Sequence, residues 1–172
     1  MASQRQRVFA GMAGAALFSI VVVTAGMTWW PFTVPAAAPL AERLAYTLRC
    51  EVFVGLMLLI GIGNVARQRF FSETAIDGSN PAADSSIDIN CRYVQNSNEQ
   101  CLLAFIGHLA LTAVMPADAL VAIPVLVTLF VIARICFWVG YHRDPVSRAF
   151  GFAATFYPTL AVYAVVIYRI LT

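Results

Sequence analysis

The 172-residue chain contains no lysine and few charged residues of any kind. Charged residues make up 12% of the chain, against about a quarter in soluble globular proteins, and 60% of its residues are hydrophobic. This composition excludes a soluble globular domain. The 11 basic residues are all arginines, scattered without a basic run, which argues against a nucleic-acid-binding protein.

The spacing typical of metal-binding and disulfide-rich proteins is also missing. The four cysteines, at positions 50, 91, 101 and 136, form no CxxC pattern and no Cys/His ligand pattern. Three of them lie in or beside apolar stretches, where cysteine usually acts as a small buried hydrophobic residue. We therefore expect neither a metal site nor a structural disulfide.

Long apolar stretches account for most of the chain, and each approaches the roughly 20 residues that a helix needs to cross a bilayer. The predicted fold is an all-α, multi-pass membrane protein. We expect a four-helix transmembrane bundle in residues 40–172, preceded in residues 1–39 by one extra transmembrane helix and a Pro-rich connector. The predicted spans are residues 8–30, 40–71, 92–115, 118–141 and 146–172.

The first apolar run, residues 8–30, follows a short head with two arginines, which is also the pattern of a secretory signal peptide. The run is longer than the apolar core of a signal peptide, and it ends on a tryptophan pair typical of a membrane interface. We therefore predict a retained span, with a cleaved signal peptide as the alternative. Residues 31–39, rich in proline, cannot continue a helix and mark the internal boundary.

The distribution of arginines predicts the orientation of the spans. Residues 72–90 form the only sizeable polar segment, which is acidic and rich in Gly, Pro, Ser and Asn. One side of the membrane receives Arg5, Arg7, Arg67, Arg69, Arg92, Arg143 and Arg148, and the other receives Arg43, Arg49 and Arg169. This excess predicts that the amino terminus and the 72–90 loop are cytoplasmic, in the endoplasmic reticulum or another intracellular membrane. The loop is also a candidate site for a protein partner.

A polar stripe occupies one face of the predicted helix 92–115. Arg92, Asn96 and Glu99 stand at positions i, i+4 and i+7, which lie on one side of an α-helix. Deeper residues on that side are apolar, so the stripe ends near one membrane surface. This pattern is typical of a pocket rather than of an ion pathway.

The next predicted helix carries a matching group near the same surface. Arg134, Phe137 and Tyr141 share one face, and Arg148 follows them. Glu99 and Arg134 each lie about 10 Å below this surface, so we expect them to form a buried pair. A charge network that fixes helix packing and a ligand site both agree with this pattern. The excess of arginine favours a site for a small anion with carboxylates.

These residues resemble the motifs of the MAPEG family, the membrane-associated proteins in eicosanoid and glutathione metabolism. The first block is R-x-x-x-N-x-x-E from Arg92, and the second is A-R-x-x-F-W-x-G-Y ending at Tyr141, with Arg148 seven residues later. The resemblance covers residues 40–172, so the first span is an addition to the family's four helices. Within the family, residues 42–50 and 92–94 are similar to the mattrin-like branch.

The resemblance implies a homotrimer that binds glutathione, as a cosubstrate, between neighbouring subunits near the cytoplasmic face. The residues that match the glutathione-holding set are Arg92, Asn96, Glu99, Tyr141 and Arg148. We add Arg134 to this set, and Arg67 or Arg69 as a contact from the adjacent subunit. Arg148 matches the arginine that stabilises the thiolate and is the predicted catalytic residue.

Two functions follow from the resemblance. The first is an enzyme that conjugates glutathione to a lipophilic electrophile, or reduces lipid hydroperoxides, without a metal. The second is a non-catalytic, mattrin-like module that acts in membrane trafficking or in regulation of a partner protein. Phe137 stands where several catalytic members have Tyr, and Gln100 replaces another Tyr, which favours binding without turnover. Retention of the arginine set favours glutathione binding.

Two further expectations concern helix packing. His108 lies on the face opposite Arg92, and we predict that it contacts a neighbouring helix rather than carrying protons. Three small residues of the second span, Gly55, Gly61 and Gly63, are predicted trimer contacts, because small side chains let membrane helices approach closely.

Overall fold

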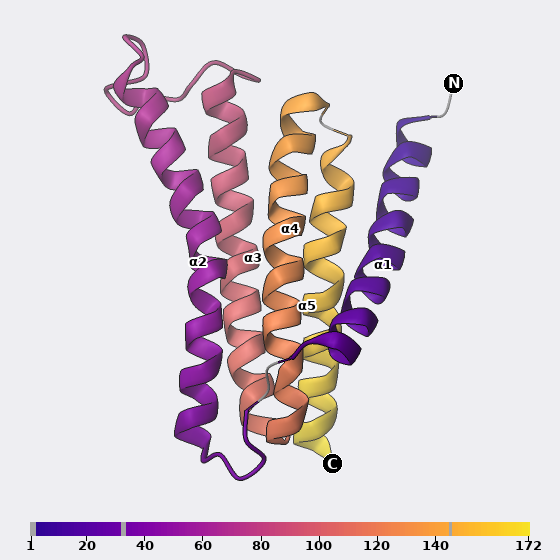
Figure 1. Ribbon diagram of the computed structural model, residues 1–172. Helices are drawn as coiled ribbons and strands as arrows, with labels where there is room; N and C mark the ends of the chain where they lie inside the picture. Colours follow the sequence, from indigo (N-terminus) through magenta and orange to yellow (C-terminus); the bar gives the residue numbers. More distant parts are fainter. Residues whose placement is uncertain (1–2, 32–33, 145) are drawn as a thin grey trace.

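The computed structural model describes residues 3–31, 34–144 and 146–172. The elements in these ranges are all helical: α1 (Gln4–Trp29), α2 (Leu40–Phe70), α3 (Ser86–Val114), the short 3-10 helix η1 (Ala117–Val121), α4 (Ala122–Arg143) and α5 (Arg148–Leu171). The long helices lie side by side and alternate in direction, so the start of α1, the α2–α3 connection and the α4–α5 turn share one end of the bundle (Figure 1). The predicted all-α bundle, with an extra helix before it, is confirmed.

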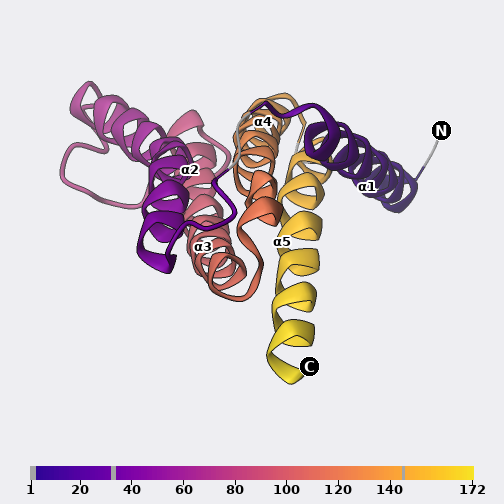
Figure 2. The ribbon, with the colours of Figure 1, turned by 60° about the horizontal axis from the view of Figure 1, so that its bottom comes forward.

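The protein is an integral membrane protein by the length and composition of its helices. Within the described ranges, α1, α2, η1 with α4, and α5 are long and apolar enough to cross a membrane. The first half of α3 is rich in polar residues, so this helix is less apolar than the others, but its 29 residues run beside them through the bundle (Figure 1). Both views place α3 beside α2 (Figures 1 and 2), and α3 also packs against α4 and α5. Several of its polar side chains, including Asn90, Ser97 and Gln100, are buried there.

The start of α3 also differs from the prediction. The helix begins at Ser86 rather than near Arg92, so the connection between α2 and α3 ends at residue 85. Ser85 Oγ accepts a hydrogen bond of 3.2 Å from the Asp88 backbone N–H, and Asp88 forms an ion pair of 2.7 Å with Arg92 one turn later. These contacts stabilise a first helical turn that lacks apolar periodicity.

Small residues hold α1 against the bundle. Ala15 is fully buried, and a Cβ atom on Gly11 would lie only 3.4 Å from the Phe150 backbone nitrogen. Near the other end of the helix, a Cβ on Gly26 would lie 2.6 Å from Val125 Cγ1. Small side chains permit this close approach between membrane helices. The first span is therefore a packed part of the fold.

The glycines of α2 do not share one role. A Cβ on Gly61 would lie 2.8 Å from Tyr93 Cε1, so this glycine lets α2 pack on α3 of its own chain. Its predicted role in a trimer contact is wrong, because the side facing Tyr93 is already occupied. No described atom lies within 4 Å of the Cβ positions of Gly55 and Gly63, for which a trimer contact stays a prediction.

Gly151 sets the separation of α4 and α5, which both carry predicted site residues. A Cβ there would lie 2.3 Å from the Phe137 backbone nitrogen. Because a backbone atom cannot rotate away, Gly151→Ala should lower the free energy of unfolding by about 1–3 kcal/mol. Gly63→Ala is the control, since its Cβ meets open space and alanine favours a helix by about 1 kcal/mol. Unfolding in detergent measures both, and equal losses would contradict the packing described.

Candidate functional site

A cavity of about 700 Å³ opens between α1, α3, α4 and α5, toward the end of the bundle where α1 begins. Its volume lies in the range of roughly 300–1,000 Å³ typical of small-molecule sites. Five predicted site residues line it: Arg92, Asn96, Glu99, Tyr141 and Arg148. The structure thus brings together residues from three helices that are far apart in the sequence.

The two arginines that line the cavity have different partners. Arg92 forms ion pairs of 2.7 Å with Asp88 and 3.3 Å with Asp84, so two carboxylates share its charge. Arg148 lies over the ring of Tyr141, with its Cζ atom 4.6 Å from the ring centroid. It forms no ion pair with any carboxylate in the described part of the chain. Arg148 is therefore the cavity cation whose charge is not offset by a partner.

The predicted buried pair of Glu99 and Arg134 does not form. Glu99 is exposed at the cavity, whereas Arg134 is fully buried and donates from Nη1 to Asn96 Oδ1 at 2.9 Å. Asn96 and Glu99 are three residues apart, which rotates their side chains by about 60° around the α3 axis. This rotation turns Asn96 toward Arg134 and Glu99 away from it.

Arg134 lies behind the cavity wall and does not line it. Its guanidinium is 4.2 Å from the ring centroid of Phe137 and 6.0 Å from that of Tyr93, an arrangement that stabilises a cation. Its Nε and Nη2 atoms have no hydrogen-bond partner among the described residues. A buried guanidinium without a carboxylate raises the electrostatic potential around it, which here includes Asn96 and the cavity.

The arginines at the end of α2 lie away from this cavity. Arg67 donates to Asn64 Oδ1 at 3.1 Å on the surface of α2. Arg69 donates to the Ser79 backbone oxygen at 3.4 Å and holds the α2–α3 connection. Among the described residues, no residue of α2 lines the cavity. Within one chain neither arginine reaches the site, and a contact from Arg67 to a neighbouring subunit stays a prediction.

Comparison with known proteins identifies the family. The MAPEG family model matches residues 45–168. The chain belongs to the MAPEG family. It is 28% identical over 156 residues to Transmembrane protein 79 of Mus musculus, and 30% identical over 150 residues to that of Bos taurus. These alignments cover 91% and 87% of this chain and 39% and 38% of the relatives.

The chain therefore spans about two fifths of the length of these relatives. Both are mattrin, which confirms the predicted similarity to the mattrin-like branch of MAPEG. No solved structure matches the chain. The match to the MAPEG model begins inside α2 and includes the predicted site residues of α3, α4 and α5, while α1 lies outside it.

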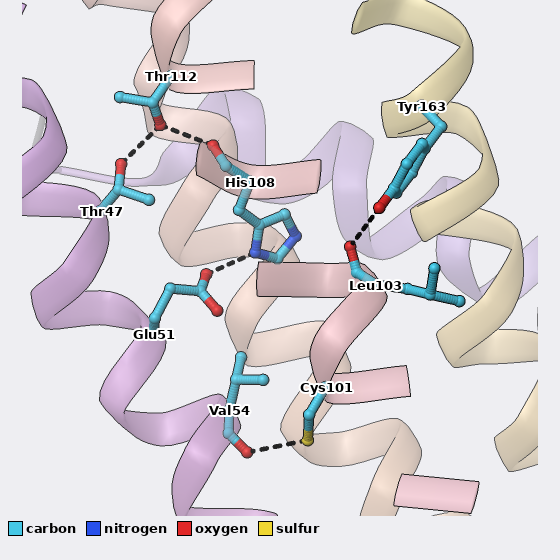
Figure 3. Close-up of polar contacts among 8 residues, drawn as sticks. All are labelled: Thr47, Glu51, Val54, Cys101, Leu103, His108, Thr112 and Tyr163. Atoms are coloured by element: carbon cyan, nitrogen blue, oxygen red, sulfur yellow. Dashed lines mark hydrogen bonds and ion pairs between the residues drawn. The ribbon is translucent and has the colours of Figure 1, made fainter. Parts of the chain in front are cut away.

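A second polar cluster is buried deep in the MAPEG-like bundle, between α2 and α3 (Figure 3). His108 Nδ1 lies 2.6 Å from Glu51 Oε1, and one turn away Thr47 Oγ1 lies 2.7 Å from Thr112 Oγ1. The predicted helix-contact role of His108 is confirmed. Its partner Glu51 was not predicted, although the sequence contains a signal for it. Each helix carries two polar residues at i and i+4. Because the helices are antiparallel, the first polar residue of α2 meets the second of α3, and the second of α2 meets the first of α3.

Helix α1 supplies cavity-lining residues that were not predicted. Gln4, Val8 and Met12, at a spacing of four, lie on the side of α1 that faces the cavity. A side of a helix that faces lipid is as apolar as this side of α1. The sequence therefore offers no signal that distinguishes the side of α1 that faces the cavity from the side that contacts lipid.

An ion pair fixes the start of α1 beside the site. Arg7 binds Asp144 in the α4–α5 turn. A hydrogen bond from the Val146 backbone N–H and, to a smaller extent, one from Arg7 hold the pKa of Asp144 below its usual value. Because the pKa of Asp144 is lower in the folded protein than in the unfolded chain, the ion pair stabilises the fold fully at pH values above the unfolded-chain pKa of about 3.9. This stabilisation is lost as the pH falls through the pKa of Asp144 in the folded protein.

We therefore expect the first turns of α1 to stay docked at neutral pH and to loosen in strong acid. Asp144→Asn should loosen them at neutral pH, because the charge that binds Arg7 is removed. Hydrogen exchange of residues 4–12 measures the docking, with Asp77→Asn, in the α2–α3 connection, as the control. Unchanged exchange in Asp144→Asn would show that the ion pair does not hold α1.

Proposed function

We propose that the protein binds glutathione in the cavity lined by α1, α3, α4 and α5. The observation that carries the proposal is that five residues matching the MAPEG glutathione motifs line one cavity of suitable volume. Glutathione has two carboxylates, one ammonium group and one thiol. Arginine side chains bind carboxylates through paired hydrogen bonds, and a carboxylate such as Glu99 binds the ammonium group.

Each residue has a distinct role in this proposal. Arg148 stabilises the thiolate, since a nearby cation lowers the pKa of a thiol. Arg92 and Asn96 bind the polar backbone and carboxylates of the tripeptide, with Tyr141 stacked beneath Arg148. Arg134 acts as a positioning residue, because it holds Asn96 from behind.

The proposed reaction is attack of the glutathione thiolate on a lipophilic electrophile that enters from the bilayer, or on a lipid hydroperoxide. In the conjugation, the sulfur forms the new bond and the leaving group departs with its electron pair. In the reduction, the sulfur bonds to one peroxide oxygen while the O–O bond breaks and the lipid alcohol leaves. A second glutathione thiol then attacks this sulfur, which gives the disulfide and releases water. Phe137 lines the cavity without a hydroxyl group that could donate to the thiol. This observation favours a second candidate function, a mattrin-like module in membrane trafficking or partner regulation that binds glutathione without turnover.

The proposal includes a homotrimer in an intracellular membrane such as the endoplasmic reticulum, with the start of α1 and the α2–α3 connection in the cytoplasm. The outward face of α2 is strongly apolar and suits contact with lipid and neighbouring subunits. Its exposed apolar residues include Leu48, Val52, Phe53, Leu56 and Leu59. Native mass measurement in mild detergent tests the assembly, and a monomer would contradict it.

Thermal unfolding of the purified full chain with millimolar glutathione tests the proposed function. Ligand at 100 times its dissociation constant stabilises the folded state by about 2.7 kcal/mol, which raises the unfolding midpoint measurably. A conjugation assay with 1-chloro-2,4-dinitrobenzene and a peroxidase assay with a lipid hydroperoxide then separate the two candidates. Stabilisation without turnover in either assay selects the binding module, and absence of stabilisation contradicts the glutathione site.

A further inference from the structure

We infer that α1 forms the wall of this cavity that contacts the group bound to the glutathione sulfur. The site therefore prefers glutathione that carries an apolar group on its sulfur. The inference rests on the proposed function and concerns the part of the site that lies outside the MAPEG match. It differs from the arrangement implied by the family resemblance, because the wall comes from the same chain rather than from a neighbouring subunit.

The cavity lining divides into a polar side and an apolar side. The predicted glutathione-holding residues make up the polar side on α3, α4 and the start of α5. The apolar side is formed by Val8 and Met12 of α1, together with Val146, Ala149 and Phe152 at and after the α4–α5 turn. Apolar surface favours a ligand that carries methylene groups, because their transfer from water is favourable.

The position of this apolar wall is fixed by packing and by polar contacts. Gly11 lies between the two lining residues in sequence and packs against the Phe150 backbone. A capping box begins the helix beside the cavity, with Ser3 Oγ accepting from the Gln6 N–H and Gln6 Oε1 accepting from the Ser3 N–H. The Arg7–Asp144 ion pair holds the same turns. α1 is therefore a preorganised wall.

Binding of glutathione and S-hexylglutathione to the full chain tests this inference by isothermal titration. The parent should bind S-hexylglutathione at least about tenfold more tightly, which corresponds to burial of about two methylene groups. Met12→Trp fills the apolar side and should remove this preference, so that the ratio of the two affinities falls to about one. Phe9→Trp is the matched control, since Phe9 is 72% exposed on the same turn of α1 and should keep the preference.

Val8→Ser removes apolar surface without adding bulk, should also reduce the preference, and decides the test if Met12→Trp does not fold. Two outcomes overturn the α1 wall while glutathione binding stands. One is a parent that binds both ligands equally, and the other is the parental preference retained in both α1 variants. A parent that binds neither ligand instead contradicts the proposed function, and the inference with it.

Discussion

Replacing Glu51 by leucine should lower the free energy of unfolding by about 3–5 kcal/mol, the typical cost of removing one partner of a buried pair. His108 Nδ1 lies 2.6 Å from Glu51 Oε1, with side-chain exposures of 4% for His108 and 3% for Glu51. No solvent reaches the imidazole to replace the lost carboxylate. An unpartnered ionisable group at this depth in a membrane protein is costly. Unfolding followed by circular dichroism in detergent measures the loss.

Two variants control this prediction. Glu51→Gln keeps a side-chain group that can hydrogen bond to His108 and should cost less than the leucine variant. Glu99→Leu removes an exposed carboxylate and should change the free energy of unfolding by no more than about 0.5 kcal/mol. A larger loss in Glu99→Leu than in Glu51→Leu would instead support the buried Glu99–Arg134 pair predicted from the sequence.

Replacing Arg148 by alanine should weaken glutathione binding by about 10- to 150-fold, because a hydrogen bond to a charged group contributes about 1.5–3 kcal/mol. Arg148 has no acidic partner among the described residues, so its full charge acts on a bound anion. Its side chain is exposed at the start of α5, and the fold should tolerate the change. Arg92→Ala should have a smaller effect, since Asp84 and Asp88 already offset its charge.

The sequence predicts the helices well because their apolar runs depend on local composition. Spacing along α3 predicts that Arg92, Asn96 and Glu99 share one side of the helix. The resemblance to the MAPEG motifs implies that they join Tyr141 and Arg148, and all five line the cavity. The relation between two helices is harder to predict. Equal expected depths below the membrane surface predict a pair between Glu99 and Arg134. Packing sets the rotation of α3 about its axis, and this rotation turns Glu99 away from Arg134.

Other features of the structure depend on partners that a single segment does not reveal. The first turn of α3 is stabilised by Ser85 and by the Asp88–Arg92 pair instead of by an apolar stripe. Val8 and Met12 of α1 carry the same apolar chemistry whether they face lipid or a cavity. In contrast, the sequence carries a signal for the Glu51–His108 pair, because polar residues stand at i and i+4 on two successive antiparallel helices.

Isothermal titration of glutathione into the parent and into Arg148→Ala, in the same detergent at neutral pH, tests whether the cavity binds glutathione through Arg148. Arg143→Ala is the matched control, because Arg143 is exposed at the nearby end of α4 and does not line the cavity. We expect saturable binding to the parent and to Arg143→Ala, and binding at least about tenfold weaker to Arg148→Ala. Equal binding to all three proteins, or no saturable binding to the parent at millimolar glutathione, would contradict this expectation.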